Sequence, residues 1–165
     1  MKSLNDDRVH VHMTDVRRAE DVRSFIEAAR QAWGRIDVLF SNAGNAGVVA
    51  PLAEYPEDVF DSVMAVHVRG AFLVCKYALP HMADFGSIII TSSVAGVIGA
   101  EGVYAYITAK HAQIGLMRSI SKEAGHRGIR VNTLHPGPVS NDFQLGIERQ
   151  ISQAIQRDAA TMFDE

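Results

Sequence analysis

The sequence has little of what a secreted or membrane-spanning protein needs. Its 165 residues include a single cysteine, Cys75, so no internal disulfide can form and a disulfide-stapled secreted scaffold is excluded. Cys75 lies in an apolar stretch, which favours a core residue over a reactive thiol. The first residues lack the apolar run of a signal peptide, and no stretch approaches the ~18 uninterrupted apolar residues of a membrane span. We therefore expect a cytoplasmic protein without a membrane partner.

Other absences exclude further classes of function. The net charge is −3, the pI is about 6.1 and there is no basic block, so we expect no nucleic-acid partner. His10 and His12 alternate onto one face of a predicted strand, but no third ligand follows at zinc spacing, so we predict no metal site. No G-x-S-x-G elbow is present, which leaves an α/β-hydrolase unsupported.

The apolar residues form short runs that alternate with helical patterns. Of the 165 residues, 47% are hydrophobic, enough for one domain over residues 1–165. The runs predict strands at residues 9–13, 36–40, 87–91 and 129–134. Helices are predicted at residues 18–33, 56–82 (with a break near His67) and 103–124. This alternation is typical of an α/β fold, and the runs at 36–40 and 87–91 predict strands buried on both faces of a parallel sheet.

A phosphate-binding glycine loop is missing from the place where one is expected. In a doubly wound nucleotide-binding sheet, a G-x-G-x-x-G turn follows the first strand, and nothing similar follows residues 9–13. Gly96, Gly99 and Gly102 do follow a strand, but their spacing is wrong and the next helix begins only after them. We interpret residues 96–102 as a mobile active-site loop.

Three polar residues, Ser93, Tyr106 and Lys110, are candidates for a catalytic site. Tyr106 and Lys110 are four residues apart on a predicted helix, so they share a face. A positive charge near a phenol lowers its pKa from about 10, which makes tyrosine a usable proton donor and acceptor near neutral pH. The alternative is a surface lysine beside a half-buried tyrosine. Ser93 and the segment 42–44 (Asn-Ala-Gly) each follow a predicted strand, where the active groups of open α/β sheets belong.

In their order and spacing, these motifs resemble the short-chain dehydrogenase/reductase family over nearly the whole chain. Residues 34–39 (G-R-I-D-V-L), followed by Asn-Ala-Gly at 42–44, resemble the family's fourth strand and its N-A-G motif. Ser93 and Tyr106-x-x-x-Lys110 match the catalytic serine and the Y-x-x-x-K motif. The resemblance implies a Rossmann-like, doubly wound parallel sheet with helices on both faces, truncated at both ends.

The same resemblance implies an oxidoreductase that uses NAD or NADP on a secondary alcohol or ketone. Tyr106 would be the catalytic acid and base, Ser93 would bind the same substrate oxygen, and Lys110 would hold the nicotinamide ribose. The pair Asp15-Val16 matches the residues that touch the adenine ring, and residues 136–139 match the P-G segment beside the nicotinamide. The implied cofactor contacts are Asp15, Val16, Asn42, Ala43, Gly44, Tyr106, Lys110, Pro136, Gly137 and Val139.

The chain departs from the family pattern at one position inside the site. The motif N-V-x-G reads His67-Val68-Arg69-Gly70, so a histidine stands where the family has the asparagine of a water-borne proton relay. Either His67 has inherited the relay, or it packs and bonds a backbone carbonyl at the helix break. In both cases we expect burial and the charge of Lys110 to lower its pKa below about 6.5.

Further departures concern the two ends and the surface. Measured against the family, residue 1 falls just before the third strand and residue 165 falls inside the substrate lid. The glycine-rich turn and the seventh strand are therefore expected to be missing. The alternative to an enzyme is a truncated, non-catalytic remnant that acts as an interaction partner or has no function. The helices around 57–82 and 103–124 are expected to form a homodimer or homotetramer, since the first is apolar nearly all round.

Overall fold

The structure is a computed structural model that describes residues 8–139 and 145–146. Two of its helices lie where the sequence predicts them. Helix α1 (Ala19–Trp33) has acidic residues in its first turn and ends at Gly34, whose φ of 80° suits a residue without a Cβ. Helix α4 (Tyr104–Ala124) ends at Gly125. The predicted helices at 18–33 and 103–124 are therefore confirmed.

A π-turn interrupts the long helical stretch in the middle of the chain. Helix α2 (Glu57–Met64) continues through the π-turn (Ala65–Arg69) into helix α3 (Gly70–Ala78). The predicted break near His67 is confirmed, because His67 is the middle residue of the π-turn. By length and mean hydropathy (1.3) the stretch Glu57–His81 could cross a membrane, but 44% of that window is buried inside the protein, as in a core helix.

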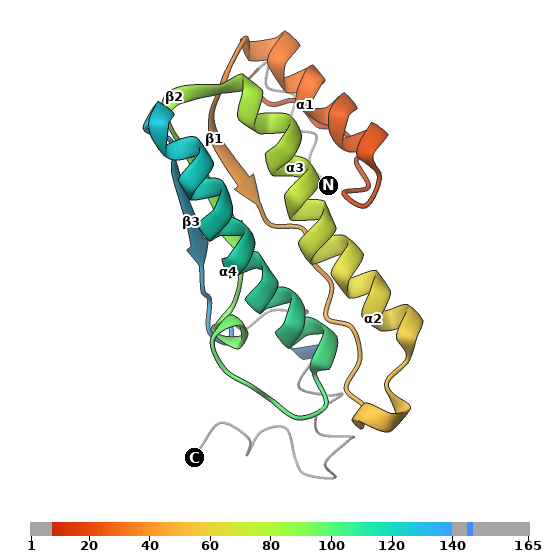
Figure 1. The fold of residues 1–165 in the computed structure, drawn as a ribbon. Coiled ribbons are helices and arrows are strands. Elements are labelled where there is room, and N and C mark those ends of the chain that lie inside the picture. The colour runs from red at the N-terminus through yellow and green to blue at the C-terminus, as the bar shows by residue number, and fades with distance from the viewer. Residues whose placement is uncertain (1–7, 140–144, 147–165) are drawn as a thin grey trace.

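The sheet has three described strands, all parallel and in chain order (Figure 1). They are β1 (Ile36–Ser41), β2 (Met82–Thr91) and β3 (Arg130–Leu134). Leu39 pairs with Ile88, and Ile88 pairs with Val131 on the other side. Strand β2 begins at Met82 and not at the predicted residue 87. The predicted α/β fold with a Rossmann-like parallel sheet is confirmed.

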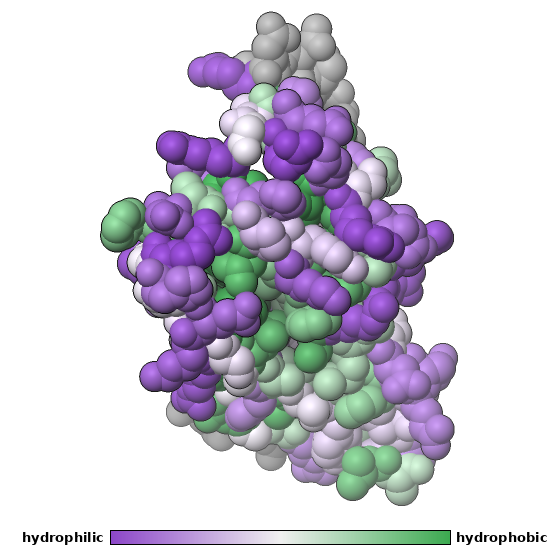
Figure 2. All heavy atoms as spheres, turned by 45° about the horizontal axis from the view of Figure 1, so that its top comes forward, coloured by the Kyte–Doolittle hydropathy of each residue, from purple (hydrophilic) through white to green (hydrophobic). Residues whose placement is uncertain are grey.

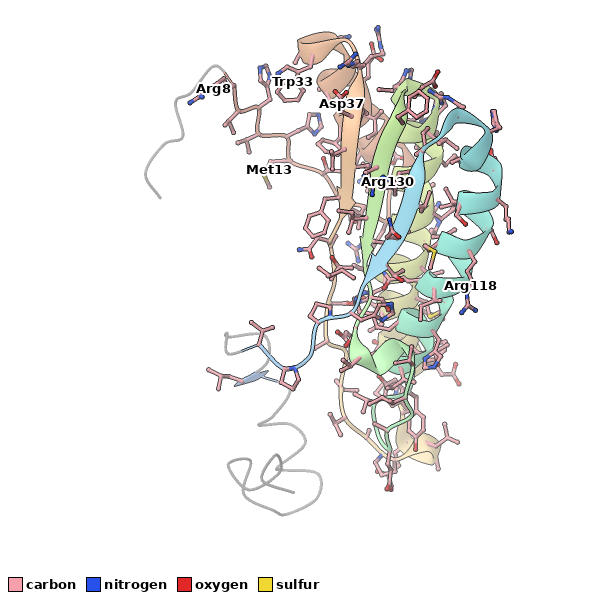
Figure 3. The ribbon with its side chains drawn as sticks, turned by 90° about the vertical axis from the view of Figure 1, so that its left-hand side faces the viewer. Arg8, Met13, Trp33, Asp37, Arg118 and Arg130 are labelled. Carbon is pink, nitrogen blue, oxygen red and sulfur yellow. The ribbon has the colours of Figure 1, made fainter. Side chains whose placement is uncertain are left out.

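The two faces of this sheet differ in what covers them. Figures 1 and 3 show the described helices on one face of the strands. Ile88 and Ile90 point toward these helices and are fully buried, and Leu39 is buried beside them. Val38 and Phe40 point to the opposite face and are 62% and 53% exposed. In the described part of the chain, the expectation that β1 is buried on both faces is therefore wrong, because nothing there covers the second face.

The predicted strand at residues 9–13 is also wrong. The segment pairs with no strand in the described structure, and the Met13 side chain is 90% exposed and points away from the protein (Figure 3). It lies against α1 instead, where His10 meets the Trp33 ring and His12 Nε2 lies 3.1 Å from Ser24 Oγ. The alternating pattern is that of a strand, but a strand forms only when a neighbour accepts its backbone hydrogen bonds. That neighbour is lacking among the described residues.

An apolar cavity of about 610 Å³ lies between this segment, α1 and β1. Its walls include Val16, Phe25 and Trp33, together with the length of β1. Figure 2 shows apolar side chains gathered inside a rim of hydrophilic ones on the face that comes forward from the top of Figure 1. The outer edge of β1 is therefore open along an apolar hollow.

Candidate active site

The ends of β2 and β3 are joined by backbone hydrogen bonds just where the site begins. Beyond β2, the Ser92 N–H donates to the Leu134 carbonyl (2.8 Å) and the Val94 N–H donates to the Pro136 carbonyl (3.1 Å). The Ser92 hydroxyl donates to the Lys110 carbonyl on α4 (2.9 Å). These bonds fix the loop that carries Ser93 against the helix that carries Tyr106.

The three predicted catalytic residues come together where the ends of β2 and β3 meet α4, a place called the corner below. The Ser93 side chain caps a short 3₁₀ turn by accepting the Ala95 N–H (3.1 Å), and it hydrogen-bonds Tyr106. The Lys110 ammonium lies 5.3 Å from the centre of the Tyr106 ring and donates to the Thr91 carbonyl (2.7 Å). Strand β2 thus supplies the serine through its end, and α4 supplies the other two.

Burial sets the protonation of this corner. It raises the pKa of Tyr106 above 10, and the hydrogen bond from Ser93 acts in the opposite direction. It also lowers the pKa of Lys110 to about 8, because a buried ammonium loses its hydration. The expectation that Lys110 lowers the pKa of Tyr106 is therefore wrong. Helical spacing brings the two residues together, but the ammonium lies over the ring and desolvation of the phenolate outweighs it.

His67 enters the same corner from the π-turn and is 1% exposed. Its Nε2 lies 2.8 Å from the Asn45 carbonyl oxygen and 3.0 Å from the Asn45 nitrogen, and its ring meets the Tyr106 ring edge-on at 5.5 Å between centres. Burial and the nearby Lys110 charge lower the pKa of His67 to about 4, which confirms the expected direction. Between the two roles foreseen for His67, the contacts show bonding to the backbone, and no hydrogen bond joins its imidazole to Lys110 in the described structure.

The predicted cofactor contacts fall into separate groups. Asn42, Ala43 and Val16 line the apolar cavity, and Tyr106 is not among its lining residues. Gly44 faces the His67 ring so closely that a Cβ would lie 2.6 Å from its Cε1. The Asp15 carboxylate is tied to Arg17, whose hydrogen bonds hold the pKa of Asp15 at about 2.

Residues after β3 complete the predicted set. The Pro136 carbonyl holds Val94, while Gly137 and Val139 continue the chain beyond it, and Val139 is exposed. They lie on the same side of the site as Ser93, since His135 Nδ1 is 2.9 Å from the Ser93 carbonyl oxygen.

The glycines at 96–102 shape the approach to Tyr106. A Cβ on Gly96 would lie 2.5 Å from the Ser92 hydroxyl, so this glycine lets the turn pack against the loop after β2. Gly102 has a φ of 79° and its carbonyl accepts the Ala50 N–H (3.2 Å). That contact ties the segment to the loop after β1. Whether the segment moves stays a prediction.

Four polar residues of the corner escaped the sequence analysis. Thr91 and Ser92 hold Lys110, Asn45 holds His67, and Gln113 Nε2 donates to the His67 carbonyl (3.0 Å). Thr91 and Ser92 do adjoin the predicted serine. Asn45 and Gln113 carry no spacing signal, because their partners are 22 and 46 residues away.

The described residues fit one half of a nicotinamide dinucleotide better than the other. An ammonium has three N–H donors, and Lys110 directs one of them at Thr91, so the others are available for ribose hydroxyls. The buried Thr91 hydroxyl also has no hydrogen-bond partner in the described structure. For the pyrophosphate, no glycine turn at a helix start occurs among the described residues beside the apolar cavity.

Comparison with known proteins fits this geometry. A family model described as "Enoyl-(Acyl carrier protein) reductase" matches residues 2–162. Short-chain dehydrogenase reductase 3a of Arabidopsis thaliana is 35% identical over 162 residues, which is 96% of this chain and 63% of that protein. The chain belongs to the short-chain dehydrogenase/reductase family. The resemblance inferred from the motifs is thereby confirmed.

Solved structures of this short-chain dehydrogenase/reductase family share the fold. Levodione reductase superposes with a TM-score of 0.84 and 32% identity, covering 91% of this chain and 59% of that one. NAD⁺-bound xylitol dehydrogenase gives a TM-score of 0.80 and 36% identity, covering 86% and 54%. The chain therefore spans about half to two thirds of the relatives it matches. The levodione reductase of Leifsonia aquatica is likewise 32% identical over 99% of this chain but 62% of its own length.

Proposed function

We propose that the chain carries the catalytic half of an NAD(P)-dependent oxidoreductase that acts on a secondary alcohol or ketone. The observation that carries this proposal is the meeting of Ser93, Tyr106 and Lys110 at the carboxyl end of β2. Dehydrogenases and reductases among the matched relatives, and neighbours bound to NAD⁺ or NADP, support the cofactor class. The choice between NAD and NADP has no support in the described residues.

Each residue has a definite task in the proposed reaction. When bound, the nicotinamide supplies or accepts the hydride. Tyr106 gives a proton to the carbonyl oxygen through its hydroxyl, or takes one from the alcohol, and its raised pKa keeps it protonated as the acid form. Ser93 donates a hydrogen bond to the same oxygen and orients it. Lys110 would hold the ribose hydroxyls with the N–H groups not used on Thr91.

Replacing Tyr106 by phenylalanine tests the proposal. Tyr106→Phe keeps the ring that packs on His67 but removes the proton, so kcat should fall at least a hundredfold, within the range of general acid–base catalysis. Turnover is measured on the longest polypeptide that contains this chain, with NADH and NADPH and a set of cyclic and linear ketones. Tyr104→Phe, two residues earlier on α4, is the matched control and should keep wild-type kcat. A Tyr106→Phe protein that retains a tenth of wild-type kcat would show that another group carries the proton.

A second candidate function, a non-catalytic interaction role, is favoured by the open apolar hollow beside β1. Titration of the chain with NAD⁺ and NADP⁺ separates the two candidates. Binding that Lys110→Met weakens supports the enzyme, because Lys110 would contact the ribose. If neither nucleotide binds and no ketone is turned over by the longest polypeptide, the non-catalytic role is favoured.

We also propose a homodimer or homotetramer through α4 and the stretch α2–α3. Most of α3 is buried within the chain, but Phe72 remains 46% exposed on its outer face. An exposed aromatic side chain on an apolar helix is typical of a contact surface.

A further inference from the structure

The loops at the carboxyl ends of the three strands have few charged side chains. Residues 42–56 follow β1, residues 92–103 follow β2 and residues 135–139 follow β3. Together they contain two carboxylates, Glu54 and Glu101, one histidine, and neither lysine nor arginine. Proteins bind phosphate and carboxylate groups mostly with such cations, so these loops are poorly suited to an anionic substrate.

The histidine of these loops, His135, is engaged at both ring nitrogens. Its Nδ1 lies 2.9 Å from the Ser93 carbonyl oxygen, which can only accept, so Nδ1 carries a proton. Its Nε2 lies 2.8 Å from the Thr133 hydroxyl. The imidazole therefore joins the end of β3 to the loop after β2 and has no nitrogen left for a substrate.

The cations closest to these loops have other partners. The Lys110 ammonium is buried and donates to the Thr91 carbonyl, and the proposed function assigns its remaining N–H groups to the cofactor ribose. The Arg69 guanidinium, from the π-turn, donates to the Arg17 carbonyl just before α1. In the part of the corner that the structure describes, no lysine or arginine remains for a negatively charged substrate.

Apolar side chains stand in the place of charges beside Ser93. Val94 is exposed, and Val97 and Ile98 are 65% and 54% exposed. They belong to an ordered turn, since the Val97 N–H donates to the Val94 carbonyl (3.1 Å) and the Val94 N–H is held by Pro136. Large apolar side chains exposed together on one surface mark a binding site.

The loop after β1 adds apolar surface at the start of α4. Figure 1 shows this loop and the loop after β2 at the end of the molecule where α4 begins. The Ala50 N–H donates to the Gly102 carbonyl, and a Cβ on Gly102 would lie 2.9 Å from Val49 Cγ1. The two loops thus meet through apolar contact close to Tyr106, which lies in the first turn of α4.

We propose that the site takes an uncharged ketone or secondary alcohol with apolar substituents, and that Val97 and Ile98 select for it. This inference rests on the proposed function, because it names the substrate class of the same site. A phosphorylated or carboxylated substrate would approach Glu54 and Glu101 with no cation to bind it. An apolar one gains up to about fourfold in affinity for each methylene that these side chains remove from water.

A matched pair of ketones tests the charge preference. One is cyclohexanone with a methyl group opposite the carbonyl, and the other has a carboxylate in place of that methyl. With the longest polypeptide that contains this chain, kcat/KM should be at least tenfold higher for the methyl compound. Along the methyl ketones from butanone to octanone, kcat/KM should rise about two- to fourfold per methylene. Equal values for the pair, or a preference for the carboxylate, would overturn the proposal.

Lysine substitutions at the exposed apolar positions should reverse this preference. Val97→Lys and Ile98→Lys each place a cation beside Ser93, so the ratio of kcat/KM for the pair should shift toward the carboxylate by at least tenfold, less so at high salt. Ile98→Leu should keep the wild-type ratio. Ser119→Lys is the matched control, because it adds the same charge to an exposed position about 20 Å farther along α4. An unchanged ratio in both lysine variants would reject the assigned role of Val97 and Ile98.

Binding measured by NMR separates this inference from the proposed function and needs neither turnover nor a variant. With ¹³C-methyl labels, the alcohol of the methyl compound should shift the Ile98 and Val97 signals, and the alcohol of the carboxylate should not. Val38, exposed on the uncovered face of the sheet, is the internal reference. If Ile98 shifts but no ketone is turned over, the proposed function fails and the substrate class stands. Equal shifts at Val38 and Ile98, or none at Ile98, would overturn the inference even in an active enzyme.

Discussion

Two regions of the sheet are built from similar apolar strands but differ in what surrounds them. One is the corner where β2 and β3 meet α4, and the other is the outer edge of β1. At the corner, buried polar groups such as Lys110 and Ser92 have hydrogen-bond partners. Along β1, apolar side chains such as Phe40 face an open hollow. The difference shows that the arrangement of Ser93, Tyr106 and Lys110 is held by β2, β3 and α4, while the flank beyond β1 is open in the described structure.

The largest expected effect compares two neighbouring isoleucines on opposite faces of β2. Ile88 packs against the helix layer and is 0% exposed, while Ile89 is half-buried and faces the uncovered side. Ile88→Ala should lower the free energy of unfolding by about 2–5 kcal/mol, because it leaves a cavity in a packed core. Ile89→Ala should cost less than about half as much. Urea unfolding of both variants measures the difference, and equal costs would mean that the second face is covered in solution.

A smaller effect concerns the charge buried at the corner. Because the pKa of Lys110 is lowered to about 8, the unfolded chain holds one more proton than the folded chain between pH 8 and about 10.5. The contribution of Lys110 to stability should therefore rise by about 1–3 kcal/mol across this window. Urea unfolding at several pH values, for the wild type and Lys110→Met, isolates this contribution. Parallel pH profiles of the two proteins would contradict the burial of the ammonium.

The smallest change in stability is expected at the open flank. Phe40→Thr removes an exposed ring and keeps a residue that suits a strand, so the free energy of unfolding should change by no more than about 0.5 kcal/mol. The fluorescence of a dye that binds exposed apolar surface should fall in the same variant. Leu39→Thr, one residue earlier and buried, is the matched control and should destabilise the chain strongly. Unchanged dye binding in Phe40→Thr would show that the hollow is closed in solution.

The sequence predicts the parts of this molecule that depend on local patterns. Helices α1 and α4 follow from apolar spacing and from the glycines that end them, and the break at His67 follows from its motif. The run at residues 9–13 has a strand's pattern, but pairing depends on a neighbour that a local pattern cannot supply. The start of β2 at Met82 depends on pairing with Ile36, a contact between distant segments.

In the candidate site, too, the sequence predicts what depends on local patterns and does not predict what depends on burial in the fold. The positions of Ser93, Tyr106 and Lys110 follow from strand ends and helical spacing. The direction of the Tyr106 pKa does not, because it depends on how much water the fold removes from the phenol. The direction for His67 was predictable, since an apolar helix implied burial and Lys110 was already expected nearby.

The π-turn also makes the helical stretch sensitive to insertions and deletions. It places one more residue in its turn than an α-helix would, so α3 presents Ala71, Val74 and Ala78 to the core in a phase set by that extra residue. Deleting a single codon there would turn α3 by about 100° about its axis and draw it back by about 1.5 Å. The buried side chains would rotate toward solvent together. A substitution at position 67 leaves the phase of α3 unchanged, whereas an insertion or deletion within residues 65–69 would turn its buried face away from the core.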